Sequence, residues 1–328
     1  MVVVTGANGL LGSFVIRKLL EAREPFIALK RKNSDISLLK DIADQVMWND
    51  VDILDAEATN DALHDAERVI HCAALVSFNP RDKKKLHEVN VVGTRNVVNS
   101  CIANRVKRLV HVSSIGAIGR QKNVFEADEN EKWAVSPLNT DYGESKYLAE
   151  LEVMRGREEG LDVVIVNPSV ILGPGMPGRS SARIFSYVWK GRRFYMDGKI
   201  NYVSATDTAE IIYRLLSEGE SGERFIASAG MVPLGSLMEK IALNFGKRPP
   251  SIRLNTRLLT VLAWVEKLRS GISGAQPLVT RESVRSLSSP VHFRNVKVKK
   301  ALNFEFQSID ETLEWCCETY ARQLNGKK

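Results

Sequence analysis

Two side chains that could share a proton stand four residues apart in the stretch DYGESKYLAE. Tyr142 and Lys146 form a Y-x-x-x-K pair, and on a helix this spacing places both side chains on one face. A tyrosine with its ordinary pKa of about 10 is a poor base at neutral pH. An ammonium group one helical turn away favours the phenolate and lowers that pKa. The pair therefore predicts a phenol that donates or accepts a proton during catalysis.

A pair of serines offers a hydroxyl to the same site. Ser113 and Ser114 follow the apolar run RLVHV, which has the composition of a buried strand. Sheets of parallel strands bind ligands at the carboxyl ends of those strands. We expect Ser114 to hydrogen-bond a substrate carbonyl or hydroxyl, with Ser113 as the alternative assignment. The Y-x-x-x-K spacing alone is also typical of an amphipathic surface helix, so the serines strengthen the catalytic interpretation.

The N-terminal stretch VVVTGANGLLGSF has the pattern of a phosphate-binding loop. Three glycines, each three residues from the next, follow a strand-like run and open a helix-like one. The first permits a tight turn, the second lets the backbone approach a pyrophosphate, and the third lets helix and strand pack closely. The helix N-terminus adds free amides and a positive dipole end. The predicted loop contacts are Gly6, Asn8, Gly9, Leu10, Leu11 and Gly12.

Basic residues stand where such a unit usually carries an acid. Lys30 ends the second apolar run, FIALK, and Arg31 and Lys32 follow it. An acid at this point binds the ribose 2′-hydroxyl of NAD and would repel a 2′-phosphate, whereas Lys30 and Arg31 would bind one. The sequence therefore favours NADP(H), with NAD(H) as the alternative cofactor. The structural alternative is a solvated basic loop.

Two later segments would complete the nucleotide site. In VDILD, after the third strand, Asp52 is placed to accept a hydrogen bond from the adenine amino group and Ile53 to pack on the ring. In HCAAL, after the fourth strand, the small residues Ala73 and Ala74 let a cofactor lie close to the backbone. Lys146 can also hold the hydroxyls of the nicotinamide ribose.

Apolar runs alternate with helical patterns along the first half of the chain, which predicts an α/β fold with a Rossmann-type, doubly wound parallel sheet. The runs are MVVVTG, FIALK, VMWND, RVIHCAA, RLVHVSS and LDVVIVNPSV, and RFIAS (224–228) is a further candidate strand. We predict a dinucleotide-binding domain over 1–170, to which 203–228 returns. A smaller, irregular C-terminal substrate-binding part comprises 171–202 and 229–328.

Composition excludes several classes of protein. The 328 residues are 44% hydrophobic and 26% charged, and no apolar run reaches the length of a membrane-spanning helix. The stretch MVVVTGANG has no basic n-region and no small-residue cleavage site, so no secretory signal is expected. The four cysteines and five histidines show no metal-ligand spacing, so no metal site is predicted. Reduced thiols are typical of a cytoplasmic protein.

The net charge of +7 is uneven along the chain. Basic and acidic residues number 30 and 31 through Ser228 but 16 and 8 from Ala229 onward. This excess could attract an anionic substrate or a membrane surface, but no motif indicates nucleic-acid binding. The apolar stretch RLLTVLAWVEKL (257–268) is interpreted as a buried helix or a lid over the substrate, with an interfacial anchor as the alternative.

Together these motifs resemble the extended short-chain dehydrogenase/reductase superfamily, in its NAD-dependent epimerase/dehydratase family. TGANGLLG, DILD, HCAALVSF, NVVGT, HVSSIGAIG, YGESK and NPSVILGPG follow the family order over essentially the whole chain. The resemblance implies a catalytic triad of Ser114, Tyr142 and Lys146, and a homodimer formed through helices at 91–102 and 142–154. It also implies cofactor contacts from Asn90, Ser113, Asn167, Pro168, Ser169 and Val170.

Departures from the family pattern narrow the expected reaction. Sugar-nucleotide 4,6-dehydratases carry an acid just after the catalytic hydroxyl residue, whereas Ile115 and Gly116 stand there in this chain. Ile118 also replaces the tyrosine that usually precedes Gly119. HCAALVSF and the apolar SSIGAIG are most similar to the dihydroflavonol-reductase and 3β-hydroxysteroid-dehydrogenase branches, which act on secondary alcohols or ketones of rather apolar substrates.

The leading hypothesis is therefore an NADP(H)-dependent oxidoreductase that interconverts a ketone or aldehyde and an alcohol on a small, rather apolar substrate. A nucleotide-sugar epimerase with tightly bound NAD is the second hypothesis, because the pair Asn167-Pro168 also occurs in such epimerases. The third is a non-catalytic NADP(H)-binding sensor or scaffold.

Overall fold

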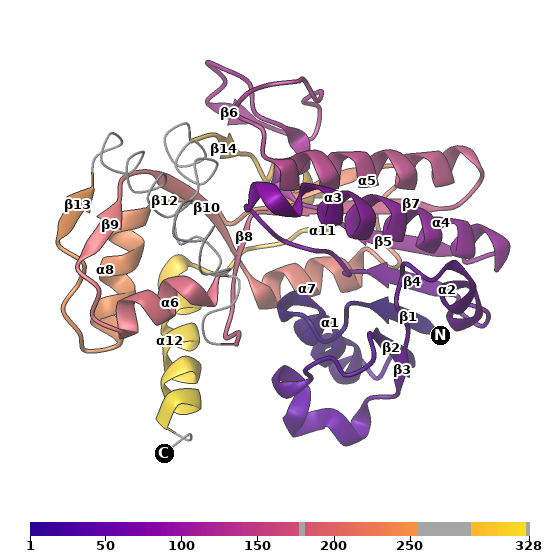
Figure 1. Cartoon of the computed structure of the whole chain (residues 1–328), viewed down its shortest axis with the longest axis horizontal. Helices are drawn as coiled ribbons and strands as arrows, with labels where there is room; N and C mark the ends of the chain where they lie inside the picture. The colour runs from indigo at the N-terminus through magenta and orange to yellow at the C-terminus, as the bar shows by residue number, and fades with distance from the viewer. Residues whose placement is uncertain (177–180, 255–289, 326–328) are drawn as a thin grey trace.

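A seven-stranded parallel sheet forms the centre of the computed structural model, which describes residues 1–176, 181–254 and 290–325 (Figure 1). The strand order is β11-β7-β5-β4-β1-β2-β3. The strands are β1 (Val2–Thr5), β2 (Phe26–Lys30), β3 (Trp48–Asp50), β4 (Arg68–His71), β5 (Arg108–Val112), β7 (Val163–Pro168) and β11 (Arg224–Ala227). The order reverses between β1 and β4, which is where doubly wound sheets bind dinucleotides. The predicted Rossmann-type fold and the strand at 224–228 are confirmed.

Side-chain alternation along the strands explains why helices cover both faces of this sheet. In β1, Val2 and Val4 belong to one core cluster and Val3 to the other, and all three are fully buried. The first cluster includes residues of α1 (Leu10–Glu21), α7 (Ala205–Arg214), α11 (Val296–Leu302) and the 3₁₀ segment η1 (Ser37–Gln45). The second includes residues of α4 (Gly93–Ala103) and α5 (Asp141–Glu158), beside α2 (Ala56–Ala62). Figure 1 shows α4 and α5 above the strands, with α1 and α7 below them.

The second part of the molecule is built around a three-stranded sheet with the order β12-β10-β8. Its strands are β8 (Val170–Leu172), β10 (Lys199–Ser204) and β12 (Gly230–Pro233), and its helices are α6 (Ala182–Trp189), α8 (Leu234–Asn244) and α12 (Ile309–Asn325). Two smaller pairs join β9 (Phe194–Met196) to β13 (Ile252–Leu254) and β6 (Glu126–Ala127) to β14 (His292–Phe293). Short helical segments are η2 (Pro80–Asp82), α3 (Lys83–Leu86), the π-helical η3 (His87–Val92) and η4 (Ile115–Ile118).

The apolar run at 161–170 does not form the single strand that its composition predicts. The Ser169 amide donates to the Ala227 carbonyl at 2.9 Å, which is the last bond of this run to the large sheet. Val170 then pairs with Tyr202 in the small sheet. The apolar residues of β7 and β8 follow one another almost without a break, so hydrophobicity alone could not show that the chain changes sheets between them.

Residues near the C-terminus also pack on the large sheet. Val298, Leu302 and Phe304 belong to the core cluster around α1, and all are nearly fully buried. The predicted substrate-binding part includes all of 229–328, so the return of this segment to the large sheet was not predicted. The assignment of the remaining segments to a substrate-binding part stays a prediction.

Some expectations concern features outside the sheet. The apolar stretch at 257–268 lies outside the described residues. Within the described part of the chain, no helix has the length and apolarity needed to cross a membrane. All four cysteines, Cys72, Cys101, Cys316 and Cys317, are free.

Two buried histidines lie side by side beneath the carboxyl edge of the sheet. The His71 and His111 rings, on the adjacent strands β4 and β5, are 5.2 Å apart. The ring nitrogens of His71 lie 2.7 Å from Thr5 Oγ1 and 3.0 Å from Thr94 Oγ1. Burial, together with the charge of Lys146, lowers the pKa of His71 to about 3, and burial holds the pKa of His111 well below its ordinary value. Both rings are therefore neutral at physiological pH.

These histidines should make the protein sensitive to acid. Below pH 6.5 the unfolded chain takes up protons that the folded chain cannot, so the free energy of unfolding should fall as the pH drops toward 4. Each buried histidine should contribute a slope of up to about 1.4 kcal/mol per pH unit. We expect a shallower slope for His71→Gln in denaturant titrations at several pH values. The same substitution at the exposed His64 is the control, and equal slopes for the two variants would contradict the prediction.

Candidate active site

The glycine loop forms a close contact between β1, α1 and the end of β4. Gly6 has a φ of +66°, and a Cβ there would lie 2.7 Å from the backbone of Ala73. A Cβ on Gly12 would lie 2.2 Å from the Gly6 carbonyl oxygen. Gly9 occupies the N-cap of α1, and its amide donates to Gly6 at 3.0 Å. Only glycine fits at Gly6 and Gly12, so the loop packs tightly at the N-terminus of α1, whose first-turn amides could face a phosphate.

The other predicted loop residues flank this cradle. Leu10 and Leu11 begin α1, where amides of the first turn lack helical partners. The Asn8 side chain donates to the Asp35 carbonyl at 3.1 Å and so ties the loop to the segment after β2. The structure therefore shows a structural role for the Asn8 side chain.

The basic residues after β2 differ from one another in their surroundings. Lys30 forms an ion pair with Asp50 at the end of the neighbouring strand β3. Arg31 and Lys32 are exposed. An ammonium group held by a carboxylate is less available to a phosphate, so Arg31 is the better placed of the two predicted ligands. The sequence could not reveal the Asp50 contact, because Asp50 is twenty positions further along the chain.

The residues predicted at the adenine lie in two different environments. Asp52 is exposed, and its carboxylate accepts the Leu54 amide at 3.0 Å. Ile53 is 7% exposed, and its δ-methyl faces Gly93 of α4, where a Cβ would lie only 2.6 Å away. Ile53 is therefore mainly a core residue, and its contact with an adenine ring stays a prediction.

The Asn90 side chain connects two segments of the protein through hydrogen bonds. Its side chain is fully buried, accepts the Leu75 amide at 2.7 Å and donates to the Leu75 carbonyl at 3.0 Å. The same amide group donates to Ser145 Oγ of α5 at 2.9 Å. Asn90 thus fixes the segment after β4, with the partly exposed Ala73 and the exposed Ala74, against the helix that carries the tyrosine.

The first turn of α5 brings Tyr142 and Ser114 together. Thr140 caps the helix and accepts the Gly143 amide at 2.9 Å, while Ser114 Oγ accepts the Gly116 amide at 3.1 Å. A Cβ on Gly143 would lie 2.7 Å from the Gly116 carbonyl oxygen. This close contact lets η4 approach α5, and sequence reasoning missed it although the Tyr-Gly pair signals it.

The Tyr142 phenol is half-buried and lies edge-on to Phe78, with ring centroids 5.8 Å apart. Burial raises the pKa of Tyr142 to about 12, while a hydrogen bond with the Ser114 side chain acts in the opposite direction. The expected lowering of this pKa by Lys146 is therefore wrong for the protein as it stands. The reason is that desolvation of the phenolate is the larger effect.

Lys146 lies deeper than the Y-x-x-x-K pattern suggests. It is 1% exposed, and its Nζ donates to the Val112 carbonyl at 2.7 Å and lies 3.5 Å from His111 Nε2. Burial lowers the pKa of Lys146 to about 8, and the nearby Glu150 carboxylate acts in the opposite direction. The predicted pair shares one helix, but the ammonium turns toward the end of β5.

The segment 167–170 runs along the same edge. Asn167 Nδ2 donates to the Ser114 carbonyl at 3.0 Å, so β7 supports the strand end that carries both serines. Ser113 is 5% exposed and donates its amide to the Val166 carbonyl at 2.7 Å. Asn167 Oδ1 and Ser169 Oγ are buried without a hydrogen-bond partner among the described residues.

These features fit a dinucleotide. The glycine loop carries no side chains at three positions beside the N-terminus of α1, so its backbone can approach a phosphate there. The unpartnered Asn167 and Ser169 oxygens lie near the carboxyl end of β7. Buried polar atoms without partners are groups that a bound ligand can satisfy. In the described residues no group of acidic, histidine or cysteine side chains could hold a metal ion.

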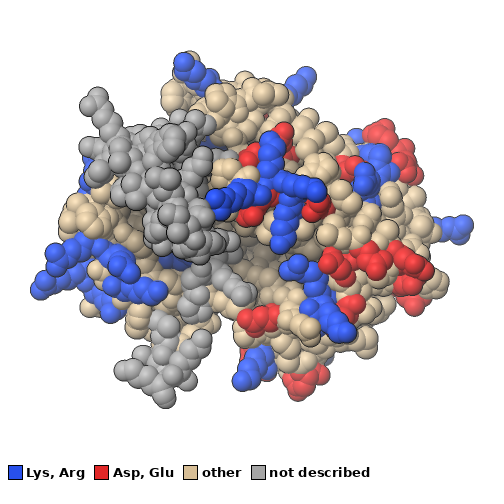
Figure 2. Space-filling view, in the orientation of Figure 1, with Lys and Arg blue, Asp and Glu red and all other residues tan. Residues whose placement is uncertain are grey.

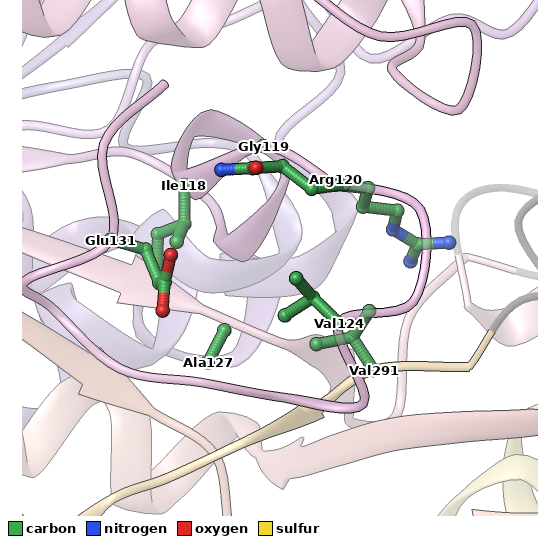
Figure 3. A pocket seen from close by; sticks show the side chains of 8 residues that line it. Ile118, Gly119, Arg120, Val124, Ala127, Glu131 and Val291 are labelled. Carbon is green, nitrogen blue, oxygen red and sulfur yellow. The ribbon is translucent and has the colours of Figure 1, made fainter. Parts of the chain in front are cut away.

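A small pocket lies beyond η4, on the side of the second part of the molecule (Figure 3). Ile118, Val124 and Val291 give it apolar walls, while Arg120 and Glu131 stand at opposite sides. Figure 2 shows a separate cluster of basic side chains over η2 and α3. These two segments carry Arg81, Lys83, Lys84 and Lys85.

A family model for the NAD dependent epimerase/dehydratase family matches residues 2–227, a range that contains the glycine loop, Ser114, Tyr142 and Lys146. The chain belongs to this family. It is an NAD(P)-dependent oxidoreductase of the extended short-chain dehydrogenase/reductase type. The substrates of such enzymes are small molecules.

Curated relatives include reductases. Sterol demethylase protein B of Methylococcus capsulatus is 33% identical over 264 residues, which cover 79% of each chain. A putative dihydroflavonol 4-reductase of Synechocystis sp. is 27% identical over 316 residues, covering 94% of this chain and 91% of the relative. Cinnamoyl-CoA reductase 1 of Petunia hybrida is 26% identical and covers 76% of this chain and 78% of its own.

Solved structures confirm the fold. The crystal structure of gox2253 is 29% identical with a TM-score of 0.82 and covers 99% of this chain and 98% of its own. A UDP-glucose 4-epimerase from Thermotoga maritima has a TM-score of 0.81 at 20% identity and covers 98% of this chain and 99% of its own.

The contact between Gly143 and Gly116 should resist any added side chain. Gly143→Ala forces the backbone of η4 away and should lower the free energy of unfolding by about 1–3 kcal/mol. The control is Gly156→Ala on the same helix, where the new methyl meets the Val98 side chain rather than backbone. Chemical denaturation compares the two variants. An equal or larger loss in the control would contradict the prediction.

Proposed function

We propose that the protein is an NADP(H)-dependent reductase of a ketone or aldehyde on a small, rather apolar substrate. The observation that carries this proposal is the Tyr142 phenol with the Ser114 hydroxyl beside it, at the sheet edge that also holds the glycine loop. The cofactor supplies the hydride when it is bound. The residues of the chain then have to orient the carbonyl and provide its proton.

The state of Tyr142 favours the reducing direction. A phenol whose pKa is about 12 is protonated at neutral pH, so it is ready to donate a proton to a developing alkoxide. Ser114 is half-buried at the end of β5 and would hydrogen-bond the same oxygen. Lys146 would stabilise the phenolate left behind and hold ribose hydroxyls of the cofactor. Asn167, Pro168, Ser169 and Val170 would line the nicotinamide.

The surroundings of Tyr142 support an apolar substrate. Phe78 lies edge-on to the phenol ring yet keeps 42% of its surface exposed. Large apolar side chains that are exposed beside a catalytic group are typical of a binding surface. The relatives named as dihydroflavonol and cinnamoyl-CoA reductases are consistent with this class.

Replacing the phenol tests the proposal. We expect Tyr142→Phe to lower kcat with NADPH by at least about a hundredfold on any carbonyl that the wild type reduces, because the proton donor is lost. Tyr147→Phe on the same helix is the control, since its ring would keep the stack on Trp133 at 4.5 Å. Steady-state rates across a panel of aldehydes and ketones provide the measurement. Equal activity of Tyr142→Phe and wild type would remove Tyr142 from the mechanism.

The same panel distinguishes the two alternatives. NAD that is retained through purification, together with binding of a UDP-sugar, would favour a nucleotide-sugar epimerase. Cofactor binding without turnover of any carbonyl, combined with capture of a specific protein partner, would favour a sensor or scaffold. The homodimer and the cytoplasmic location stay predictions of the family resemblance and of the cysteine content.

Preference for NADP(H) should depend mainly on Arg31. Its guanidinium is exposed after β2, whereas Lys30 is paired with Asp50. Arg31→Ser should raise the Kd for NADPH about ten- to a hundredfold, because a charge-assisted bond to phosphate is lost. The Kd for NADH should not change. Calorimetry with both cofactors measures this, and Lys32→Ser is the matched control.

We expect Lys30→Ser to lower the affinity for NADPH less than Arg31→Ser does, because the Lys30 ammonium is already paired with Asp50. Similar losses of NADPH and NADH affinity in Arg31→Ser would show that no 2′-phosphate is bound there.

A further inference from the structure

A buried carboxylate stands one helical turn beyond Lys146. Glu150 of α5 is 3% exposed, and burial raises its pKa above the ordinary value. A buried carboxylate is costly unless charges and hydrogen bonds compensate it. The proposed reaction gives Glu150 no part in proton transfer, so its presence in the core needs another explanation.

The Ser113 side chain, which follows β5, and two residues from neighbouring strands supply that compensation. Asn167 Nδ2 of β7 donates to Glu150 Oε1 at 2.6 Å. Arg224 Nη1 of β11 lies 3.4 Å from Glu150 Oε2, and the side chain of Arg224 is 23% exposed. Both contacts oppose the effect of burial on the Glu150 pKa. The carboxylate is thus held between the catalytic helix and the edge of the sheet.

Arg224 also reaches the loop beside the pocket. Its Nη2 donates to the carbonyl of Glu129 at 2.6 Å and to that of Glu131 at 3.2 Å. The Glu129 carboxylate in turn accepts the Ile226 amide of β11 at 2.9 Å. Since Glu131 lines the pocket in Figure 3, one guanidinium connects the pocket wall to the carboxylate.

The charges of the groups around Lys146 indicate the role of the Glu150 carboxylate. His71 on β4 and His111 on β5 are neutral, and the charge of Lys146 helps to keep them so. Burial raises the pKa of the Cys72 thiol, which follows β4, to about 12. Glu150 therefore provides the main negative charge that favours the ammonium against desolvation.

We propose that Glu150, kept ionised by Arg224 and Asn167, is a positioning residue that holds the Lys146 ammonium in its charged form at the end of β5. Its catalytic consequence rests on the proposed reductase function, in which only a charged Lys146 can stabilise the phenolate of Tyr142. The electrostatic claim itself concerns the cofactor-free protein.

The first test measures the titration of Lys146 without cofactor. Protein labelled with ¹³C-lysine gives a Cε signal for Lys146, assigned by its loss in Lys146→Arg. Glu150→Gln keeps the shape of the side chain and a carbonyl for Asn167. We expect its Lys146 pKa to fall by about one unit or more, because an opposite charge is lost nearby. An unchanged titration would overturn the proposal.

Two variants of Arg224 provide an independent test. They show whether the Glu150 carboxylate raises the pKa of Lys146 even if Glu150→Gln does not fold. Arg224→Met should lower the Lys146 pKa in the same direction, and Arg224→Lys should restore most of the shift. Arg294→Met is the matched control, since Arg294 pairs with Asp128 of the same loop at 3.1 Å and has an exposed side chain. Equal titration in Arg224→Met and wild type would also overturn the proposal.

The second test uses the pH profile of turnover. In Glu150→Gln the alkaline limb should move to lower pH by the same amount as the NMR titration, so activity at pH 8 should fall about five- to tenfold. A uniform loss at every pH would mean a merely structural role and would contradict the catalytic part. If Tyr142→Phe proved fully active while the NMR shift was present, the reductase proposal would fail and the electrostatic pairing would stand.

Discussion

Lys146 carries its charge at an almost fully buried point of the site, and several surrounding groups offset the free-energy cost of that burial. Its side chain is 1% exposed, and desolvation lowers its pKa to about 8. The Val112 carbonyl at the end of β5 accepts one of its protons, and Glu150 balances its charge. The neighbouring histidines His71 and His111 stay neutral, so they add no repulsion. A surface lysine would need none of these contacts, but it would have a weaker electrostatic effect on a phenol.

A second constraint is the close approach of backbone to backbone. Gly6 and Gly12 bring the loop of β1, the start of α1 and the end of β4 together, and Gly143 brings α5 against η4. In each case a single methyl group would lie less than 3 Å from main-chain atoms. Main chain cannot move aside as a side chain can, so both contacts define distances in the site. The first shapes the glycine loop at the N-terminus of α1, and the second sets Ser114 beside Tyr142.

The apolar runs and the glycine spacing predicted most of the fold and the positions of the site motifs along the chain. They do so because apolar runs reflect the burial of strands, and glycine spacing reflects the backbone conformations that only glycine adopts easily. The sheet, the helix of Tyr142 and the loop of Gly6 follow from these properties. The features that could not be predicted depend on contacts between residues that are far apart in the sequence. The pairing of Lys30 with Asp50 and the high pKa of the Tyr142 phenol arise only when the strands assemble. The change of sheet between Pro168 and Val170 is of the same kind, since it depends on pairing with the distant residues Ala227 and Tyr202.

The carboxyl edge of the sheet is also where the core is least satisfied. Asn167 Oδ1 and Ser169 Oγ have no partner among the described residues, and Lys146 is charged there against desolvation. Each of these features costs free energy in the folded chain. A cofactor that hydrogen-bonds them would recover part of that free energy, and it would bind the folded state alone. The unsatisfied polar atoms at this edge therefore lower the stability of the empty protein and raise its affinity for a cofactor. The bound molecule stabilises the same part of the core that is incompletely hydrogen-bonded without it.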